Sequence, residues 1–396
     1  MDEIIHINRE EESLHDFHEA VASSMENIES ILILLESGSR SHSEYRRLYD
    51  EYSHIIGKLI NQSHAIDVSE FIKIFDQIKN FLNTIEKHNI ELSGRICEPL
   101  LMIMDRIHFM ADDAATYSKI RKTSYEEIAN SLSEYSKITR ANSEQVIDKT
   151  IKILTGFCKE IPPPPKIEIK QQPEKPKETS IPQKKYPSVS DIKRPSKLVQ
   201  LVKDEDKLED DLAFFKGLAD EVDLIHKEWR DRTNFIMPLA LGMNALAGNI
   251  VDFYQLQAAV YLHDVGMRFL PDELLEEKGH FTEEQRTQLL AHPSWAIENF
   301  NLMDGWEEAA WIVYQHHEKF DGTGYPEGTT GKEICHGAQI LAICDAFYSI
   351  MNRNRKRSVL RAIAEINACR GGHFAPEWVN IFNNVLTIER NAGRFD

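Results

Sequence analysis

The chain has 396 residues, of which 42% are hydrophobic, and a formal net charge of −18 at pH 7. This length is too great for one ordinary core and predicts two or three domains. The acidic balance argues against nucleic-acid binding, so no DNA partner is expected, and an anionic ligand would need a local cation. No apolar run reaches the ~18 residues of a membrane span, and the acidic N-terminus lacks the apolar core of a signal peptide. We therefore expect a cytoplasmic protein without a membrane span.

Residues 1–160 are predicted to form an antiparallel helical bundle, because apolar residues recur at helical spacing. The clearest helices are predicted at 24–37, 44–60, 69–88 and 96–110. Breaks between helices are predicted at 37–41 and 61–64. We expect this bundle to sense a signal or to dock a signalling protein partner.

Residues 48–59, LYDEYSHIIGKL, give the bundle a second interpretation. This segment resembles the histidine-phosphotransfer bundle, which carries a phosphoaccepting histidine on an exposed helix face, followed by a lysine and then a glycine. Here His54 is followed by Gly57 and Lys58, so the order is reversed. The resemblance implies that His54 is a phosphoacceptor; the alternative is a surface histidine on a sensory or docking bundle.

Residues 161–197 hold nine of the fifteen prolines and many lysines. Such a segment cannot bury enough apolar surface to fold, and it predicts a semi-rigid linker. The helical pattern returns after residue 198, with a long helix predicted up to about residue 225, and no strand alternation follows. We therefore predict an all-α fold, with a second helical domain at 198–396.

Polar residues lie at the ends of apolar helices, or inside them, at four places in this second domain. They are His263, Asp264, His292, His316, His317 and Asp345. Imidazole is a common metal ligand, and a buried carboxylate needs a partner, which a metal can be. Singly, each has another explanation: a histidine bonded to a backbone carbonyl, or an aspartate paired with an arginine.

The turn at 321–326, DGTGYP, follows the two adjacent histidines. Its glycines allow backbone angles that suit a loop shaped around a ligand. Neighbouring residues on a helix diverge by ~100°. His316 and His317 can therefore share one centre only if the helix ends there or if two metals lie close together.

These segments resemble the HD-GYP domain, a metal-dependent phosphodiesterase subgroup of the HD superfamily. The resemblance covers residues 220–390 and none of the first 200. The matching segments, in the family's order, are LHDVGMRFLPDELLEEKGHFTEEQ, LLAHPSWA, HHEKFDGTGYPEG, ILAICDAF, RNRKR and GGHFAPEWV.

The resemblance implies a helical domain with two or three iron or manganese ions that hydrolyses cyclic di-GMP to pGpG or GMP. It implies catalytic roles for His263 and Asp264, and metal-ligand roles for all six polar residues named above. A homodimer is a further expectation. The resemblance also implies that a second group of residues binds the nucleotide. That group is Gly324, Tyr325 and Pro326 of the loop, with Arg353, Arg355 and Lys356 for the phosphates.

The sequence departs from the family where a first metal-binding histidine is expected upstream. A count without gaps lands on Asp231, whose oxygen suits iron or manganese. Glu228, one helical turn earlier, can assist it. The alternative is that Asp231 is solvated and one metal position is lost.

Two lysines of the family are also replaced, by Met267 and Glu277. Arg268 is adjacent to the first and is a candidate substitute, although it points elsewhere on a helix. The favoured hypothesis is thus an active phosphodiesterase weakened by lost positive charge. The alternative is a degenerate domain that binds cyclic di-GMP, or only a partner protein, in signalling.

Overall fold

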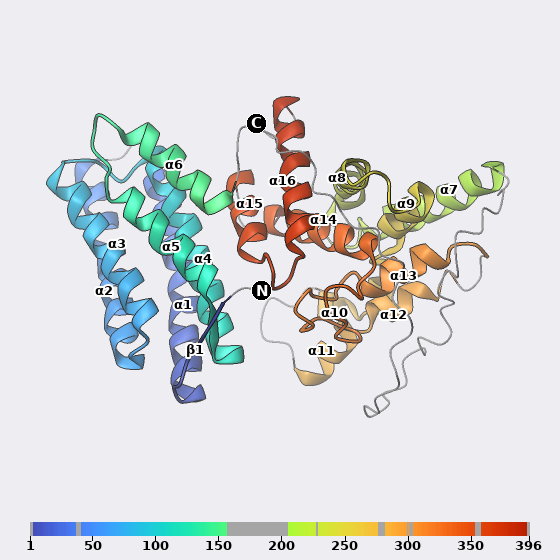
Figure 1. The fold of residues 1–396 in the computed structure, drawn as a ribbon, viewed down its shortest axis with the longest axis horizontal. Helices are drawn as coiled ribbons and strands as arrows, with labels where there is room; N and C mark the ends of the chain where they lie inside the picture. The colour runs from blue at the N-terminus through green and yellow to red at the C-terminus, as the bar shows by residue number, and fades with distance from the viewer. Residues whose placement is uncertain are drawn as a thin grey trace. The chain divides into compact units, whose positions relative to one another are not determined.

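The computed structural model describes residues 3–36, 41–156, 205–226, 229–275, 282–298, 300, 304–352 and 358–393. These residues form helices and connecting turns, apart from one two-stranded antiparallel ribbon (Figure 1). The all-α prediction is confirmed. Among the described residues, no helix combines the length and apolar character needed to cross a membrane.

The chain divides into two compact units, and the first comprises the described residues of 1–159 together with Ser358–Ala368. Its ribbon pairs β1 (Ile4–His6) with β2 (Lys119–Arg121). Its helices are α1 (Glu11–Glu36), α2 (His42–Ile66), α3 (Ser69–Lys87), the 3-10 helix η1 (Gly94–Ile96), α4 (Cys97–Tyr117), α5 (Lys122–Tyr135), α6 (Ser143–Thr155) and α15 (Val359–Ala368).

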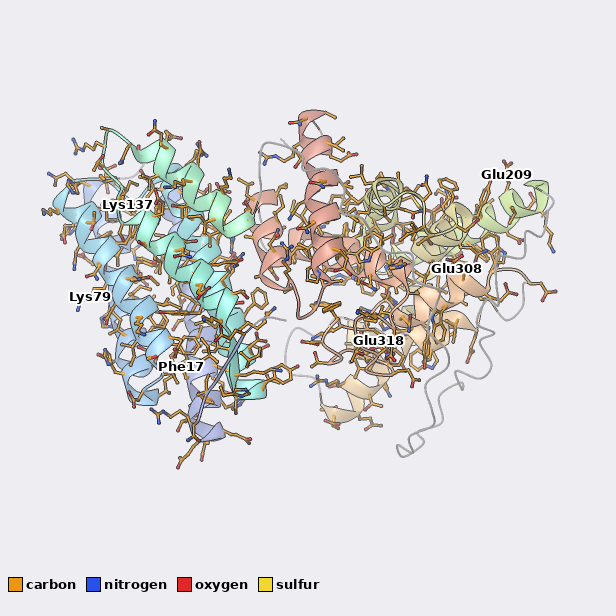
Figure 2. The ribbon with its side chains drawn as sticks, viewed as in Figure 1. Phe17, Lys79, Lys137, Glu209, Glu308 and Glu318 are labelled. Atoms are coloured by element: carbon orange, nitrogen blue, oxygen red, sulfur yellow. The ribbon has the colours of Figure 1, made fainter. Side chains whose placement is uncertain are left out.

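The core of the first unit follows from the spacing of its apolar residues. In α3, the buried residues Phe71, Ile74, Phe75 and Ile78 recur three and four positions apart, which places them on one face of the helix. Figure 2 labels Phe17 of α1, which belongs to the same core, and Lys79, which is exposed.

The break predicted at 61–64 is wrong, because α2 continues through these residues to Ile66. Ser63 is buried there, and its hydroxyl donates a 2.8 Å hydrogen bond to the carbonyl oxygen of Ile60. The helix ends where Asp67 adopts a left-handed conformation with φ 51°. The break predicted at 37–41 lies largely outside the described residues.

The second unit comprises the described residues of 160–357 and 369–396. Within it, α8 packs against α9, α14 and α16, and α13 packs against α9, α12 and α14. The predicted linker and the start of the predicted long helix lie outside the described residues. The helices are α7 (Glu205–Val222), α8 (Arg232–Leu246), α9 (Phe253–Leu262), the 3-10 helix η4 (Val265–Phe269), α10 (Asp272–Leu275), α11 (Glu283–Leu289), α12 (His292–Ile297), α13 (Glu307–Gln315), α14 (His336–Asn352) and α16 (Pro376–Asn391).

Helix α15 departs from the contiguous domain predicted at 198–396. It packs against α4 and α6 of the first unit. Arg361 on α15 is buried and pairs with Asp105 at 3.0 Å and with Glu29 at 2.9 Å. The first unit is therefore completed by a segment that lies between α14 and α16 in the chain.

Candidate metal centre

The His263–Asp264 step lies between the end of α9 and the start of η4, and both side chains are buried. Gly266 has no room for a side chain, because a Cβ there would lie 2.0 Å from the carbonyl oxygen of His292. This glycine lets the start of α12 approach the His263–Asp264 step closely. The glycine thereby allows the His263–Asp264 step and His292 to lie close together.

Three buried histidines of the second unit are anchored in the same way. In each, Nδ1 lies within hydrogen-bonding distance of the carbonyl oxygen three residues earlier in the chain. The pairs are His263 with Val260 at 2.9 Å, His292 with Leu289 at 2.8 Å, and His316 with Val313 at 2.6 Å. Since a carbonyl oxygen only accepts, Nδ1 carries the proton, which leaves Nε2 as the nitrogen that can bind a metal. Such anchoring is typical of histidines that bind metals.

Asp264 and three histidines bring their ligand atoms to within 4.8 Å of one another. This four-residue group is Asp264, His292, His316 and His317. Nε2 of His292 lies 3.4 Å from Oδ1 of Asp264 and 3.1 Å from Nε2 of His317. Nε2 of His316 is buried and has no hydrogen-bond partner among the described residues. Converging nitrogen lone pairs beside a carboxylate are what a divalent cation satisfies, so these residues fit a metal site.

The electrostatics of the four-residue group favour the same conclusion. Burial, helped by His263 and His292, lowers the pKa of His316 to about 3, and burial also lowers the pKa of His317 well below its usual range. Burial raises the pKa of Asp264, but the charges of Arg232 and His263 outweigh it and hold that pKa well below its usual range. A neutral His316 and a neutral His317 beside an ionised Asp264 are the protonation states that metal binding requires.

Asp345, on α14, is paired with an arginine rather than joined to the four-residue group. Arg232 begins α8 and is buried; it donates from Nη1 to Oδ2 of Asp264, and from Nη2 and Nε to Oδ1 of Asp345, the last at 3.0 Å. Nε2 of His263 lies 3.8 Å from the first oxygen and 3.9 Å from the second. The guanidinium therefore lies among two carboxylates and an imidazole.

The loop that carries Gly324, Tyr325 and Pro326 lies against the four-residue group. The ring of Tyr325 stacks on that of His317, with ring centroids 4.7 Å apart and planes 21° apart. A Cβ on Gly324 would lie 2.5 Å from the carbonyl oxygen of His317, so only glycine fits there. The loop therefore forms one wall beside the candidate metal ligands.

Glu318, labelled in Figure 2, hydrogen-bonds to the backbone of this loop. It is 2% exposed, and its carboxylate accepts hydrogen bonds from the backbone N–H groups of Glu327 at 2.7 Å and Thr329 at 2.9 Å. Burial raises its pKa to about 7, although these two N–H groups act against the rise. The sequence analysis missed this role; the available signal was a charged residue placed directly after a buried helix.

Residues 237–377 match the HD domain family. The chain is also similar to several curated cyclic dinucleotide phosphodiesterases. The C-terminal half of this chain carries an HD domain of the HD-GYP type.

Three relatives show the range of this similarity. This chain is 30% identical over 149 residues to a cyclic di-GMP phosphodiesterase response regulator of Xanthomonas campestris, covering 35% of this chain and 39% of that one. It is 32% identical over 136 residues to a cyclic di-GMP phosphodiesterase of Pseudomonas aeruginosa, covering 32% and 31%. It is also 32% identical over 131 residues to a 3'3'-cGAMP-specific phosphodiesterase of Vibrio cholerae, covering 30% and 24%. The chain thus spans well under half the length of these relatives.

The structure does not bring Asp231 to the four-residue group. Asp231 is exposed and left-handed, with φ 60°, directly before α8. The next residue, Arg232, points inward instead and reaches both carboxylates. Glu228 lies outside the described residues.

The structure describes only some of the positions expected to bind the phosphates of a nucleotide. Arg268 is paired with Glu221 on α7 and is 41% exposed, so it does not face the four-residue group. Met267 is buried in an apolar cluster of the HD-GYP domain. The other residues singled out for phosphate binding, and Glu277 at the position of the second lysine, lie outside the described part of the chain. The former are Arg353, Arg355 and Lys356.

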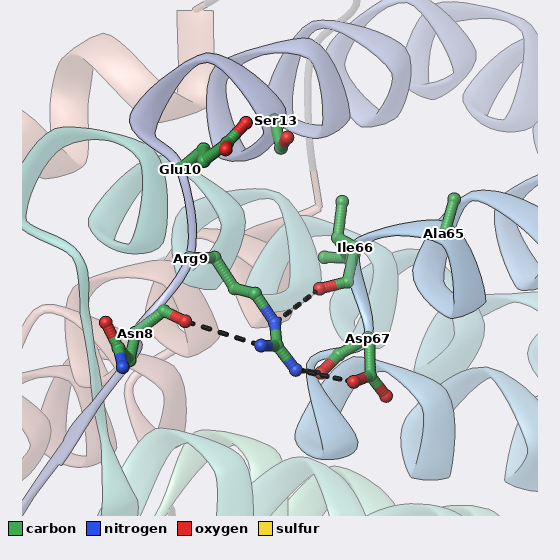
Figure 3. Close-up of a pocket in the computed structure, with 7 residues that line it drawn as sticks. All are labelled: Asn8, Arg9, Glu10, Ser13, Ala65, Ile66 and Asp67. Atoms are coloured by element: carbon green, nitrogen blue, oxygen red, sulfur yellow. Dashed lines mark hydrogen bonds and ion pairs between the residues drawn. The ribbon is translucent and has the colours of Figure 1, made fainter.

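The first unit offers two weaker candidates for a site. His54 is exposed on α2, and Lys58 is exposed one turn later. A hollow of ≈ 590 Å³ near the start of α1 contains Arg9, whose guanidinium already donates to the carbonyl oxygens of Ile66 at 3.0 Å and Asp67 at 2.8 Å (Figure 3). Because the guanidinium of Arg9 already hydrogen-bonds to these backbone carbonyls, the hollow is a poor candidate for binding an anion.

Proposed function

We propose that this chain is a metal-dependent phosphodiesterase that hydrolyses cyclic di-GMP to pGpG or GMP. The observation that carries the proposal is the four-residue group, in which Asp264, His292 and His316 are buried and three imidazoles surround one ionised carboxylate. The similarity of the HD-GYP domain to curated phosphodiesterases supports the substrate class. Because a curated relative is specific for 3'3'-cGAMP, the choice among cyclic dinucleotides belongs to the proposal.

The four-residue group would hold the metal, with iron or manganese the expected ion. A divalent ion bound there supplies a Lewis acid that neutralises phosphate oxygens and lowers the pKa of water. It would also provide positive charge for an anionic substrate on a chain with a net charge of −18.

The surrounding residues orient the ligands and shape the site. The backbone carbonyls fix the imidazole rings of His292 and His316, so that little reorganisation is needed on binding. Tyr325 stacks on His317 beside the site, where a nucleotide base or sugar can pack. Glu318 keeps this loop in place.

The test is hydrolysis of cyclic di-GMP by the full chain loaded with Mn²⁺ or Fe²⁺. We expect release of pGpG or GMP that a chelator stops and that Asp264→Asn lowers by ~100-fold or more, since the carboxylate is a ligand. Asp304→Asn, at an exposed aspartate of the same unit, should leave turnover unchanged. Absence of turnover, while an intact family member hydrolyses the substrate in parallel, would rule out the proposal.

A second candidate is a domain that binds cyclic di-GMP, or only a partner protein, without hydrolysing it. The specific observation in its favour is Arg232, which occupies both carboxylates, together with the apolar Met267. Nucleotide binding without turnover by metal-loaded protein would support this candidate, and hydrolysis abolished by Asp264→Asn would remove it.

A phosphorelay role for the first unit, with the exposed His54 as phosphoacceptor, stays a prediction. Docking of a signalling partner by this unit also stays a prediction. Transfer of a phosphoryl group to the full chain, lost on His54→Ala, would establish the former. The exposed histidine His15 of α1 supplies the matched control variant.

A further inference from the structure

The two carboxylate oxygens of Asp264 face different surroundings. Oδ1 lies 3.4 Å from Nε2 of His292 and 3.9 Å from Nε2 of His316, inside the four-residue group. Oδ2 accepts a hydrogen bond from Arg232 and lies 3.8 Å from Nε2 of His263. One aspartate therefore stands between two places that each suit a cation.

The second of these places holds the guanidinium of Arg232. It is bordered by Oδ2 of Asp264, Oδ1 of Asp345 and Nε2 of His263, and the latter nitrogen has no hydrogen-bond partner among the described residues. Two carboxylate oxygens and an imidazole nitrogen would form a metal site if the arginine were absent. An arginine there cannot give up its charge, because a guanidinium is not deprotonated in proteins.

We propose that Arg232 takes the place of a second metal ion, so that the centre holds one divalent ion, on Asp264, His292, His316 and His317. The inference rests on the proposed function to the extent that it treats the four-residue group as a metal site. It does not depend on turnover.

Charge and donor accounting favour a single ion. Arg232 already supplies one positive charge within hydrogen-bonding distance of the buried carboxylates of both Asp264 and Asp345. A second divalent ion would have to displace the guanidinium from both oxygens, or lie against it in a buried site where like charges repel strongly. The first ion meets neither obstacle, because Arg232 donates to Oδ2 of Asp264, whereas Oδ1 lies 3.4 Å from Nε2 of His292, inside the four-residue group.

The test counts metal ions on the full chain by elemental analysis after equilibration with Mn²⁺ and removal of free ion. We expect about one ion per chain in the natural protein and about two in Arg232→His, which removes the guanidinium and adds an imidazole donor. Arg268→His makes the same substitution at a partly exposed arginine and should leave the count unchanged. Arg232→Gln, which removes the charge without adding a strong ligand, provides a second variant should Arg232→His fail to fold.

Electron paramagnetic resonance gives an independent readout. An isolated Mn²⁺ should give a resolved hyperfine spectrum in the natural protein, whereas two neighbouring ions in Arg232→His should give a broadened, exchange-coupled signal. Two or more ions on the natural protein, no ion at all, or an unchanged count in both folded Arg232 variants would overturn the inference. Two ions with normal turnover would refute the inference but not the proposed function, and one ion without turnover would do the reverse.

Discussion

Glu308, on α13, gives the second unit a stability that depends on pH. Burial raises the pKa of this carboxyl to about 7, and the nearby charge of Asp252 adds to the rise. The folded state therefore holds the proton more tightly than the unfolded chain does. The sign follows from this: the unit is most stable below the ordinary carboxyl pKa and loses stability as the pH rises through about 7.

We predict that Glu308→Gln stabilises the protein at pH 8 by about 1–3 kcal/mol, a range reduced because the side chain is only half-buried. The gain should shrink several-fold at pH 5, where the natural carboxyl is largely protonated. Urea unfolding at both pH values measures the difference. Glu209→Gln, at the exposed carboxyl on α7 that Figure 2 also labels, is the control and should change little. An equal gain at both pH values would contradict the assignment.

Asp231 and Asp264 allow a second comparison between single residues. Asp231 is exposed, so Asp231→Asn should keep the full metal content, and asparagine also tolerates the left-handed backbone at this position. Asp264→Asn removes the carboxylate of the four-residue group and should weaken metal binding by ~100-fold or more. Calorimetric titration with Mn²⁺ distinguishes the two. Loss of metal from Asp231→Asn would return Asp231 to the ligand set.

At the scale of elements, the loop from Glu318 to Thr329 depends on one buried carboxylate. We predict that Glu318→Ala frees the backbone N–H groups of Glu327 and Thr329 and weakens binding of cyclic di-GMP by about tenfold or more. Metal content should change much less, because Glu318 is not in the four-residue group.

Glu318→Gln keeps one acceptor oxygen and should have an intermediate effect on the same loop. Calorimetry with the nucleotide and with Mn²⁺ separates the two kinds of binding. Equal loss of nucleotide and metal affinity would show that Glu318 acts on the ligands and not on the loop.

The elements differ in how far the sequence predicts them. The helices of the first unit were predictable, because the buried face of α3 is a property of one continuous segment. The convergence of His292 and His316 was expected from the resemblance, and their polarity at helix ends was visible directly. Arg232 was not predictable locally, since its partners lie 32 and 113 residues further along the chain. An arginine at the start of a helix is usually solvated, and only the tertiary structure reveals its burial.

For the whole molecule, the main departure from the predicted organisation is α15. This segment lies in the stretch after residue 198 that was predicted to be helical, but a helical pattern does not indicate which unit a helix packs in. Arg361 decides this, since it places its guanidinium on Asp105 of α4 and Glu29 of α1. Chain order alone had assigned the helix to the domain at 198–396. A segment of the C-terminal half thus completes the first unit.

We predict that Arg361→Ala destabilises the first unit by about 3–5 kcal/mol, because it leaves the buried carboxylate of Asp105 without its arginine. Adding Asp105→Asn should recover part of the loss, since it removes the buried charge. Urea unfolding of the full chain gives these values, and Arg390→Ala, on α16 of the second unit, is the control. A loss below about 1 kcal/mol would show that Arg361 is replaceable by solvent.

The same variants test whether the two units are coupled through the chain. Cys369 and Arg370 join α15 to Gly372 and His373, whose carbonyl oxygens accept hydrogen bonds from Asp321 at 2.9 Å and Phe320 at 3.0 Å. If α15 anchors this segment, Arg361→Ala should speed amide hydrogen exchange at Phe320 and Asp321, although neither residue is altered. Arg361→Ala with Asp105→Asn should restore part of the protection. Unchanged exchange in a variant whose first unit is clearly destabilised would show that the loop from Glu318 to Thr329 keeps its structure independently of α15.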